Sequence, residues 1–358
     1  MKRITIVLTI LLTATLASGD GPARISWGWG PVLPTAQSAL ATTAVGDDIV
    51  VVGGTYWVGP RDGVPHKVWL RTVEKLDTQA MQWESLPRYP LPVGYALAVA
   101  DGSKLWVIGG RNADRVHAEV YTLDLARENP SWIPAPSLPL PRAGARGGIS
   151  AGVIYIAAGT EEYHGQPRPA SSVLALDTND LERGWQVVGE VPRPELEWPV
   201  GTVCGGKLYL FGGLVADEQF TMAKTFIRSW HNVASSIPVR DAYCFDIATR
   251  KWQQIRPLPL ACGTGACTAL DDSHVIIAGG VALAIPASRI SGRKLHTYFS
   301  TQCLLYDTVR DRYHPLNPMP VGVGDQGCAY VNERLYMIGG EDSPWKTRTD
   351  LVQVGRVH

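Results

Sequence analysis

One glutamate and one arginine, Glu341 and Arg348, stand seven residues apart near the end of the chain. They follow the stretch Leu335-Tyr-Met-Ile-Gly-Gly340, and Ser343-Pro344 stiffens the loop between them. A carboxyl group can exchange protons during catalysis, and a guanidinium can bind a carboxylate or hold developing negative charge. Position alone favours a surface ion pair, which has little energetic effect. The elements that carry the pair must therefore be identified first.

The apolar strand and glycine pair before Glu341 recur along the chain. Each copy is a short apolar run that ends in Gly-Gly or Ala-Gly, and repetition at this spacing is typical of propellers and other repeat folds. Paired glycines give backbone freedom at the end of a buried strand. The last glycines of the six copies are Gly54, Gly110, Gly159, Gly213, Gly280 and Gly340.

A third strand and a fourth strand follow in five of the copies. The third strand ends at an aspartate, and an aromatic residue six or eight positions later marks the fourth strand, before a proline-rich segment. Each unit is therefore predicted to be one four-stranded sheet, or blade. The pairs are Asp77 with Trp83, Asp124 with Trp132, Asp177 with Trp185, Asp246 with Trp252 and Asp307 with Tyr313.

The sixth unit reaches His358 without a fourth strand. The segment 25–34 carries Trp27 six residues before Leu33-Pro34, just as Trp252 stands six residues before Leu258-Pro259. We therefore predict an all-β, six-bladed β-propeller over residues 20–358, closed by an N-terminal strand that completes the last blade. Closure removes the exposed sheet edges of an open array.

These features together resemble kelch repeats. Paired glycines, a tyrosine-rich third strand and a spaced tryptophan are the kelch signature, and the resemblance covers about residues 24–358. It implies a kelch β-propeller.

The first residues have the composition of a secretory signal peptide. Met1-Lys-Arg3 is followed by the apolar run Ile4–Leu16 and by small residues, so residues 1–19 are assigned to the signal. The run is shorter than the roughly 20 residues that span a bilayer. The alternative is an uncleaved anchor, but the pattern favours a periplasmic or secreted protein without stable membrane insertion after cleavage.

Composition excludes several classes of partner. The 33 basic and 33 acidic residues cancel, so no net field attracts nucleic acid or an anionic membrane. Neither the six cysteines nor the eight histidines have metal-ligand spacing, and no metal or cofactor is expected. The cysteines fit buried free thiols, although export would also allow one or two disulfides.

Three long loops, 55–73, 214–240 and 281–299, are predicted to lie on one face around the axis. Their positive charge suits a small anionic ligand, but exposed charge is also the ordinary state of loops. Their basic residues are Arg61, His66, Arg71, Arg228, His231, Arg289, Arg293, Lys294 and His296.

A second resemblance concerns the segment 339–350. It is similar to the Gly-Glu…Arg-Thr-Asp segment of the bacterial N-acetylneuraminate (sialic acid) mutarotases, or epimerases, which are six-bladed kelch propellers. Their Glu and Arg are the proposed catalytic pair, so the resemblance implies catalytic roles for Glu341 and Arg348. The third and fourth blades here resemble the first two of that family, which implies a cyclically permuted form.

The resemblance also implies substrate-binding groups where the blades begin. That family tends to place an Arg-Asp-Gln cluster where this chain has Glu195-Leu-Glu197-Trp198, and its Glu-to-Arg spacing is one residue shorter. Equivalent groups could come from other blades. The candidate substrate-binding residues are Arg142, Arg146, Glu197, Asp325 and Gln326.

The function implied by this resemblance is cofactor-free interconversion of the α and β anomers of a sialic-acid-like sugar. Glu341 would exchange protons, and Arg348 would bind the sugar carboxylate and hold charge as the ring opens. The alternative is a non-catalytic kelch propeller that binds a glycan or a protein. A lyase or an oxidase on the same scaffold is a third interpretation. The exact sugar and the oligomeric state stay open.

Overall fold

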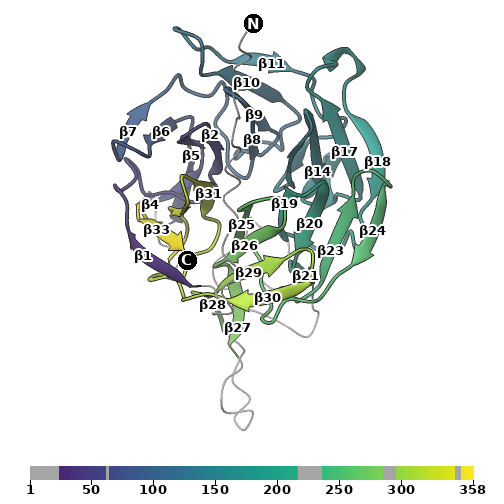
Figure 1. Ribbon diagram of the computed structural model, residues 1–358. Coiled ribbons are helices and arrows are strands. Elements are labelled where there is room, and N and C mark those ends of the chain that lie inside the picture. Colours follow the sequence, from purple (N-terminus) through teal and green to yellow (C-terminus); the bar gives the residue numbers. More distant parts are fainter. Residues whose placement is uncertain (1–23, 62–63, 217–235, 285–295, 343–347) are drawn as a thin grey trace, which may run out of the picture.

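The structure is a computed structural model that describes residues 24–61, 64–216, 236–284, 296–342 and 348–358. The predicted signal peptide lies outside these residues. In the described part, the only helical turn is a 3-10 turn, Leu181–Arg183, and the remaining regular elements are β-strands. They form six four-stranded antiparallel sheets arranged around one axis (Figure 1). The predicted all-β propeller is confirmed.

The sheets follow the chain in order, each from its innermost to its outermost strand. The first three are β2 (Ala41–Val45), β3 (Asp48–Val52), β6 (Val73–Asp77), β7 (Gln82–Ser85); β8 (Leu97–Asp101), β9 (Lys104–Ile108), β10 (Val120–Asp124), β11 (Ile133–Ala135); and β13 (Arg146–Ser150), β14 (Val153–Ala157), β17 (Ser172–Asp177), β18 (Gln186–Glu190). The other three are β19 (Val200–Cys204), β20 (Lys207–Phe211), β23 (Ala242–Asp246), β24 (Lys251–Gln254); β25 (Ala266–Ala269), β26 (His274–Ala278), β29 (Cys303–Asp307), β30 (Arg312–Pro315); and β31 (Gly327–Val331), β32 (Arg334–Ile338), β33 (Val352–Val357), β1 (Ile25–Trp29).

The innermost strands form a closed cycle. Strands β2, β8, β13, β19, β25 and β31 contact one another in that order, and β31 contacts β2. Every sheet therefore has a neighbour on each face. This explains why the second strands are continuous apolar runs: β9 and β32 are buried at all positions after the first.

The glycine pairs lie where neighbouring sheets approach most closely. A Cβ on Gly53 would lie 2.2 Å from the carbonyl oxygen of Val93, and one on Gly212 would lie 2.0 Å from that of Cys262. Both glycines also have positive φ angles, 63° and 62°. Only glycine satisfies both conditions without strain.

The aromatic residues of the outermost strands join each blade to the one before it. Trp83 donates its indole N–H to the carbonyl of Pro31 at 2.9 Å, and Trp132 donates to that of Pro87 at 2.8 Å. Trp185 donates to Pro136 in the same way, and the Tyr313 hydroxyl donates to Arg256. The predicted packing between neighbouring sheets is therefore reinforced by hydrogen bonds. Among the described residues Trp252 departs from the pattern, because its indole N–H has no partner and its ring packs on Phe245.

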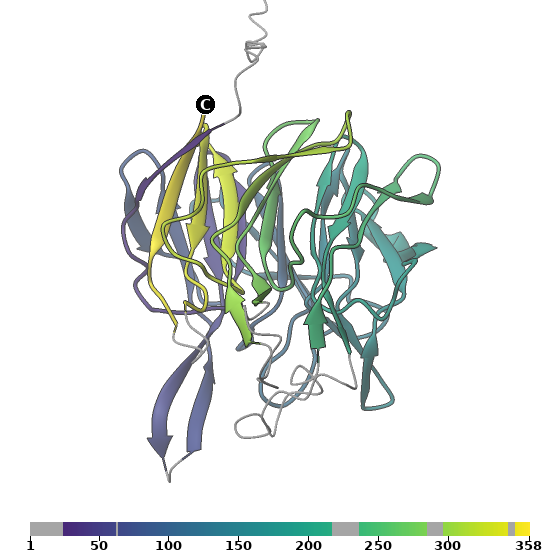
Figure 2. The same cartoon turned by 90° about the horizontal axis from the view of Figure 1, so that it is seen from below.

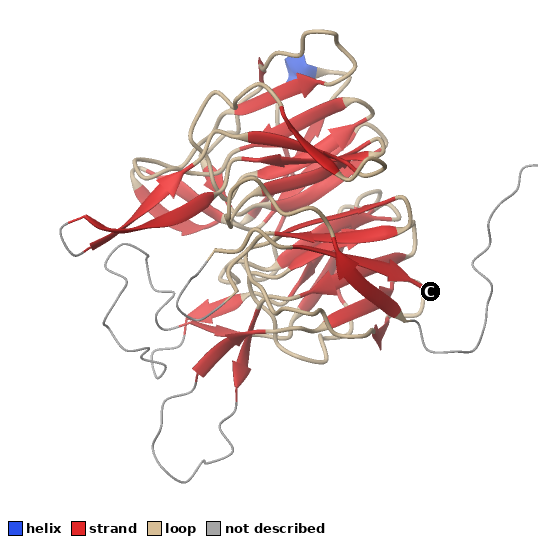
Figure 3. Ribbon diagram, turned by 90° about the vertical axis from the view of Figure 1, so that its left-hand side faces the viewer, coloured by secondary structure: helices blue, strands red, loops and turns tan. Residues whose placement is uncertain are grey.

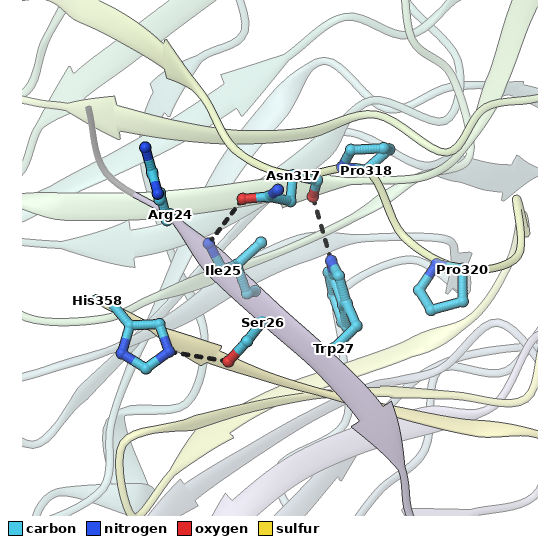
Figure 4. Close-up of a pocket in the computed structure, with 8 residues that line it drawn as sticks. All are labelled: Arg24, Ile25, Ser26, Trp27, Asn317, Pro318, Pro320 and His358. Atoms are coloured by element: carbon cyan, nitrogen blue, oxygen red, sulfur yellow. Dashed lines mark hydrogen bonds between the residues drawn. The ribbon is translucent and has the colours of Figure 1, made fainter.

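The N-terminal strand closes the ring as predicted. β1 pairs antiparallel with β33, with Ile25 opposite Val357 and Trp29 opposite Gln353. Figure 4 shows Trp27 donating its indole N–H to the carbonyl of Asn317 at 3.1 Å, which joins the sixth blade to the fifth.

Additional hairpins extend one face. β4 (Thr55–Arg61) with β5 (Val64–Trp69), β21 (Leu214–Ala216) with β22 (Ser236–Pro238), and β27 (Val281–Ala284) with β28 (His296–Phe299) each connect a second strand to a third. In the third blade, β12 (Arg142–Ala143), β15 (Thr160–Tyr163) and β16 (Gln166–Pro169) form a small sheet. Figures 2 and 3 show these extensions on the face opposite the C-terminus.

The cysteines are free thiols, as the apolar strand patterns indicated. Cys204, Cys244, Cys262 and Cys303 are buried, and Cys267 and Cys328 are partly buried. Burial raises the pKa of the Cys303 thiol to about 12, so this thiol is protonated and unreactive at neutral pH.

Ring closure through Trp27 can be tested by mutation. Trp27→Ala removes the hydrogen bond to Asn317 and the packing of the indole on Gly355, and is expected to lower the free energy of unfolding by about 2 kcal/mol. The matched control is Trp29→Ala, on the same strand but 57% exposed, expected to change it by less than about 0.5 kcal/mol. Urea denaturation measures both. Equal effects would contradict the closing role of Trp27.

Candidate active site

Five backbone hydrogen bonds connect neighbouring blades around the axis on the hairpin face. One residue just before each innermost strand has a positive φ angle, and the carbonyl of one such residue accepts the N–H of the next, as from Ala39 to Asp325 and from Tyr95 to Ala39, both at 2.8 Å. We call these residues the collar. Left-handed conformations of non-glycine residues are strained and are enriched at functional sites. The collar consists of Ala39, Tyr95, Gly144, Trp198, Thr264 and Asp325.

Backbone pairing sets Glu341 next to the collar. Glu341 directly follows the glycine pair of the sixth blade and exchanges two backbone hydrogen bonds with Gly324, the residue before Asp325. Its other side forms a β-bridge with Arg348. The seven-residue spacing thus makes Glu341 and Arg348 cross-strand neighbours, whose side chains lie on the same side.

Glu341 and Arg348 form a buried ion pair. Arg348 Nη1 lies 2.7 Å from Glu341 Oε1, and their side chains are 4% and 8% exposed, respectively. Arg348 Nε also donates to the carbonyl of Thr55 at 3.3 Å, and its guanidinium lies 6.0 Å from the ring centroid of Trp57. Removing one partner of such a pair leaves the other charge buried without a counter-ion, which lowers the free energy of unfolding by about 3–5 kcal/mol. The interpretation as a surface ion pair is therefore wrong.

Asp325 shares this environment. Burial, and then the negative charge of Glu341, raise the pKa of Asp325 to about 6, while Lys67, Arg348 and Arg146 act in the opposite direction. A carboxyl group with this pKa is present in both protonation states near neutrality and can exchange protons. Two carboxyl groups in different environments thus face the same part of the ring.

Arg146 and Glu197 also lie at the collar. Arg146 is the first residue of β13, two positions after Gly144, and its Nε donates to the carbonyl of Pro199 at 2.6 Å. Burial lowers the pKa of Arg146, which the Asp325 charge partly offsets. Glu197 directly precedes Trp198 and forms a backbone bridge with Leu214. The structure therefore brings Arg146 and Asp325 into one electrostatic environment with Glu341 and Arg348.

Arg142 and Gln326 have different surroundings. Arg142 is 2% exposed and donates to Ser172 and to Glu161, whose carboxylate also binds Arg168. Gln326 is 7% exposed and donates to the carbonyl of Ala278 at 3.1 Å. These bonds tie together strands of the framework. Substrate binding by Arg142 and Gln326 stays a prediction that these contacts do not favour.

A group of aromatic and basic residues was missed by the sequence analysis. In the β4–β5 hairpin, Lys67 Nζ donates to the Tyr95 hydroxyl at 2.8 Å and lies 4.9 Å from the ring centroid of Trp69. Tyr95 contacts Trp198 edge to face at 5.1 Å. A blade-by-blade alignment would have found some of them, because Tyr95 and Trp198 occupy the position of Asp325, and Arg111 occupies that of Glu341.

The predicted basic rim is only partly described. Arg228, His231, Arg289, Arg293 and Lys294 lie outside the described residues, so the rim stays a prediction. Within the described residues, no three His, Cys, Asp or Glu side chains are grouped to hold a metal ion. That part of the chain also contains no helix with the length and apolar character of a membrane span.

A hollow of about 600 Å³ lies at the closure of the ring, between β1 and the segment 317–320 (Figure 4). Its polar groups bind each other: Ser26 Oγ pairs with His358 Nε2 at 2.8 Å, and Asn317 accepts hydrogen bonds from the Ile25 and Trp27 nitrogens. Because the hollow is lined by no carboxyl side chain, the acid–base chemistry is assigned to the collar.

The repeated sheets of this chain match a known family of kelch-repeat proteins. The family profile of the KLHDC2/KLHL20/DRC7 Kelch-repeats domain matches residues 98–340, well over half of the chain. The chain therefore belongs to this kelch-repeat family. The match ends at the glycine before Glu341 and begins after Tyr95, so it covers the framework and leaves the Glu341–Arg348 pair outside.

Individual relatives are more distant. N-acetylneuraminate epimerase 1 of Escherichia coli O6:H1 is 23% identical over 231 residues, which are 58% of this chain and 56% of that protein. N-acetylneuraminate epimerase of Yersinia pestis is 27% identical over 232 residues, or 58% and 54%. A kelch domain-containing protein of Vibrio cholerae is 27% identical over 146 residues, or 40% and 35%. The chain thus matches about half the length of the named epimerases.

The electrostatics of Asp325 can be tested through stability. Because the pKa of Asp325 is higher in the folded protein than in the unfolded chain, its carboxylate destabilises the fold above about pH 6. This cost disappears as the pH falls below about 4, where the carboxyl group is protonated in both states. Asp325→Asn is therefore expected to melt at a higher temperature than the parent at pH 8, and the difference should vanish at pH 4.

Asp246→Asn is the control of opposite sign. The backbone N–H and the hydroxyl of Thr249 lower the pKa of Asp246, so its carboxylate stabilises the fold above the ordinary aspartate pKa. This variant should melt below the parent at pH 8. A lower melting temperature for Asp325→Asn at pH 8 would refute the buried, proton-exchanging environment of Asp325.

Proposed function

We propose that this protein interconverts the α and β anomers of N-acetylneuraminate, or of a closely similar acidic sugar, by acid–base ring opening. The observation that carries the proposal is the buried Glu341–Arg348 pair, held beside Asp325 at the collar. The names of the relatives, N-acetylneuraminate epimerases, support the choice of sugar. A propeller fold alone would not, because one fold hosts many functions.

Ring opening needs two proton transfers. A base takes the proton of the anomeric hydroxyl, the bond between the anomeric carbon and the ring oxygen breaks, and an acid protonates that oxygen. The open-chain keto form then rotates and closes on its other face by the reverse transfers. Glu341, positioned by its ion pair with Arg348, acts as the base. Asp325, whose pKa burial raises, acts as the acid.

The contacts of Arg348 revise its expected role. One guanidinium nitrogen binds Glu341 and another donates to Thr55, so Arg348 is first a positioning residue for the base. It also adds positive charge where the anomeric oxygen becomes negative. Recognition of the sugar carboxylate then requires additional cations at the collar.

A second candidate function is glycan binding without chemistry. The aromatic side chains Trp57, Trp69, Tyr95 and Trp198 favour it, because aromatic faces suit the apolar faces of sugars. We also propose an exported, periplasmic or secreted protein, based on residues 1–19, and a blade order permuted relative to the epimerases.

Mutation of the ion pair tests the catalytic proposal. Glu341→Gln keeps the shape of the side chain but removes the base, and is expected to slow anomer exchange by at least about 100-fold. Arg348→Ala should have a similar effect, because Glu341 loses its positioning. Exchange is measured by NMR on freshly released N-acetylneuraminate, with the spontaneous rate subtracted.

The matched control is the exposed ion pair of the second blade. Arg115 and Glu119 also lie between the second and third strands of their blade, but their side chains are 46% and 30% exposed. Arg115→Ala and Glu119→Gln should retain parental rates. Parental exchange in Glu341→Gln would refute the mechanism, and glycan binding without any exchange in the parent would favour the second function.

The pH dependence of the rate tests the role of Asp325. Because the acid must be protonated, kcat/KM should decrease as the pH rises through about 6, the pKa of Asp325. Asp325→Asn should exchange slowly and lose this inflection. If the rate rises through pH 6 instead, the active form of Asp325 is the carboxylate. That result would contradict its role as the acid.

A further inference from the structure

The third and fourth blades are joined at the collar by a side chain. At the other junctions, a backbone N–H of one collar residue donates to the carbonyl of its neighbour. Between Gly144 and Trp198 no such bond is present in the described part of the chain, and a Cβ on Gly144 would lie 2.5 Å from the Trp198 ring. Arg146 spans this junction instead, because its Nε donates to the carbonyl of Pro199 at 2.6 Å.

The innermost strand of the fourth blade leaves room for the Arg146 side chain. Arg146 is the first residue of β13, and a Cβ on Gly201, in β19, would lie 2.8 Å from the Arg146 Cβ. Glycine at position 201 therefore allows the arginine stem to lie against the neighbouring strand. The Arg146 side chain is partly buried, so the framework holds it while solvent still reaches it.

The guanidinium of Arg146 contacts only backbone carbonyls among the described residues. Besides the bond from Nε to Pro199, its Nη1 lies 3.5 Å from the carbonyl oxygen of Ala145. Arg142 and Arg348 differ, because each forms an ion pair with a carboxylate, at 3.1 Å and 2.7 Å. The Nε bond fixes the plane of the Arg146 guanidinium and leaves its two Nη groups for a further acceptor.

The carboxyl groups near the collar do not pair with Arg146 in the part of the chain that the structure describes. These groups are Glu197, Asp325, Glu341 and Asp342. None of the four lies at ion-pair distance from Arg146, and Asp325 is the one whose charge acts on it. The thiols of Cys262 and Cys267 also act on Arg146, but burial raises the pKa of each to about 12, so both are neutral at pH 7.

Arg146 and the proposed acid face each other across the axis. β13 and β31 are the third and sixth of the six innermost strands, so Arg146 and Asp325 stand on opposite sides of the ring. Each still acts on the charge of the other. The carboxylate of N-acetylneuraminate is bonded to the anomeric carbon itself. The cation that binds this carboxylate must therefore lie close to the groups that exchange protons at that carbon.

We infer that Arg146 binds the carboxylate of the substrate through its two Nη groups and so places the anomeric carbon between Asp325 and Glu341. The inference rests on the proposed function, because it names the group by which the same site selects an acidic sugar. A guanidinium fork fits a carboxylate, and an arginine already fixed by the Pro199 carbonyl loses little rotational freedom on binding. Arg348 is meanwhile engaged with Glu341.

The test compares N-acetylneuraminate with its methyl ester, which lacks the negative charge. Isothermal titration calorimetry gives the two dissociation constants, and NMR measures anomer exchange. The parent is expected to bind the acid at least about tenfold more tightly than the ester. Arg146→Gln removes the charge and should abolish this preference. Arg146→Lys keeps the charge without the fork and should retain part of the preference.

The two variants also separate recognition from stability. Both lose the bond from Nε to Pro199, so a purely structural role would affect them equally. The matched control is Arg256→Gln. The Arg256 Nε also joins two blades, because it donates to the carbonyl of Asp311 at 2.7 Å, but Arg256 is exposed and follows an outermost strand. This variant should keep the parental preference for the acid. Melting temperatures show whether each variant is folded.

The outcomes distinguish this inference from the proposed function. If the parent exchanges anomers but folded Arg146→Gln keeps the parental preference for the acid, the inference is overturned and the proposed function stands. If the parent shows no exchange but prefers the acid, and Arg146→Gln loses that preference, the proposed function fails and the inference stands. Equal loss of the preference in Arg146→Gln and Arg146→Lys would overturn the inference, and so would a parent that binds acid and ester equally or binds neither.

Discussion

The structure depends on the requirement that every sheet be covered on both faces. A four-stranded sheet with an apolar second strand cannot leave either side in water, and the cyclic contact of β2, β8, β13, β19, β25 and β31 meets this requirement for all six sheets at once. Pairing of β1 with β33 supplies the fourth, outermost strand of the sixth sheet. A strand from the start of the chain thereby stabilises the blade that carries Glu341.

Closure also creates the conditions for the site. The six chain segments that precede the innermost strands are brought around one axis, and their left-handed residues are joined by backbone hydrogen bonds. Side chains at equivalent positions of different blades, such as Tyr95, Trp198 and Asp325, therefore project from a rigid collar. Rigid placement of this kind is what catalytic and binding groups require.

The electrostatics of the collar connect the framework to the proposed chemistry. The Glu341–Arg348 pair is buried, where an ion pair gives little net stability but breaking it is costly. Asp325 is held with a raised pKa, although Lys67, Arg348 and Arg146 bring positive charge near it. Such an arrangement contributes little to the stability of the fold. It is favourable for proton exchange on an anionic sugar, which is why we assign function here and not to the hollow at the ring closure.

Sequence alone determined the repeat. The glycine pairs, the aspartates that end the third strands, and the role of Trp27 in the closing strand all follow from local backbone and packing rules, and the structure confirms them. Sequence also singled out Glu341 and Arg348, because they differ from the equivalent residues of the other blades. Only the tertiary structure showed that this pair is buried, that Arg142 is bonded to Glu161 and Ser172, and that Lys67 meets Tyr95. These facts depend on contacts between blades, and no spacing within one repeat encodes which side chains of different blades meet at the axis.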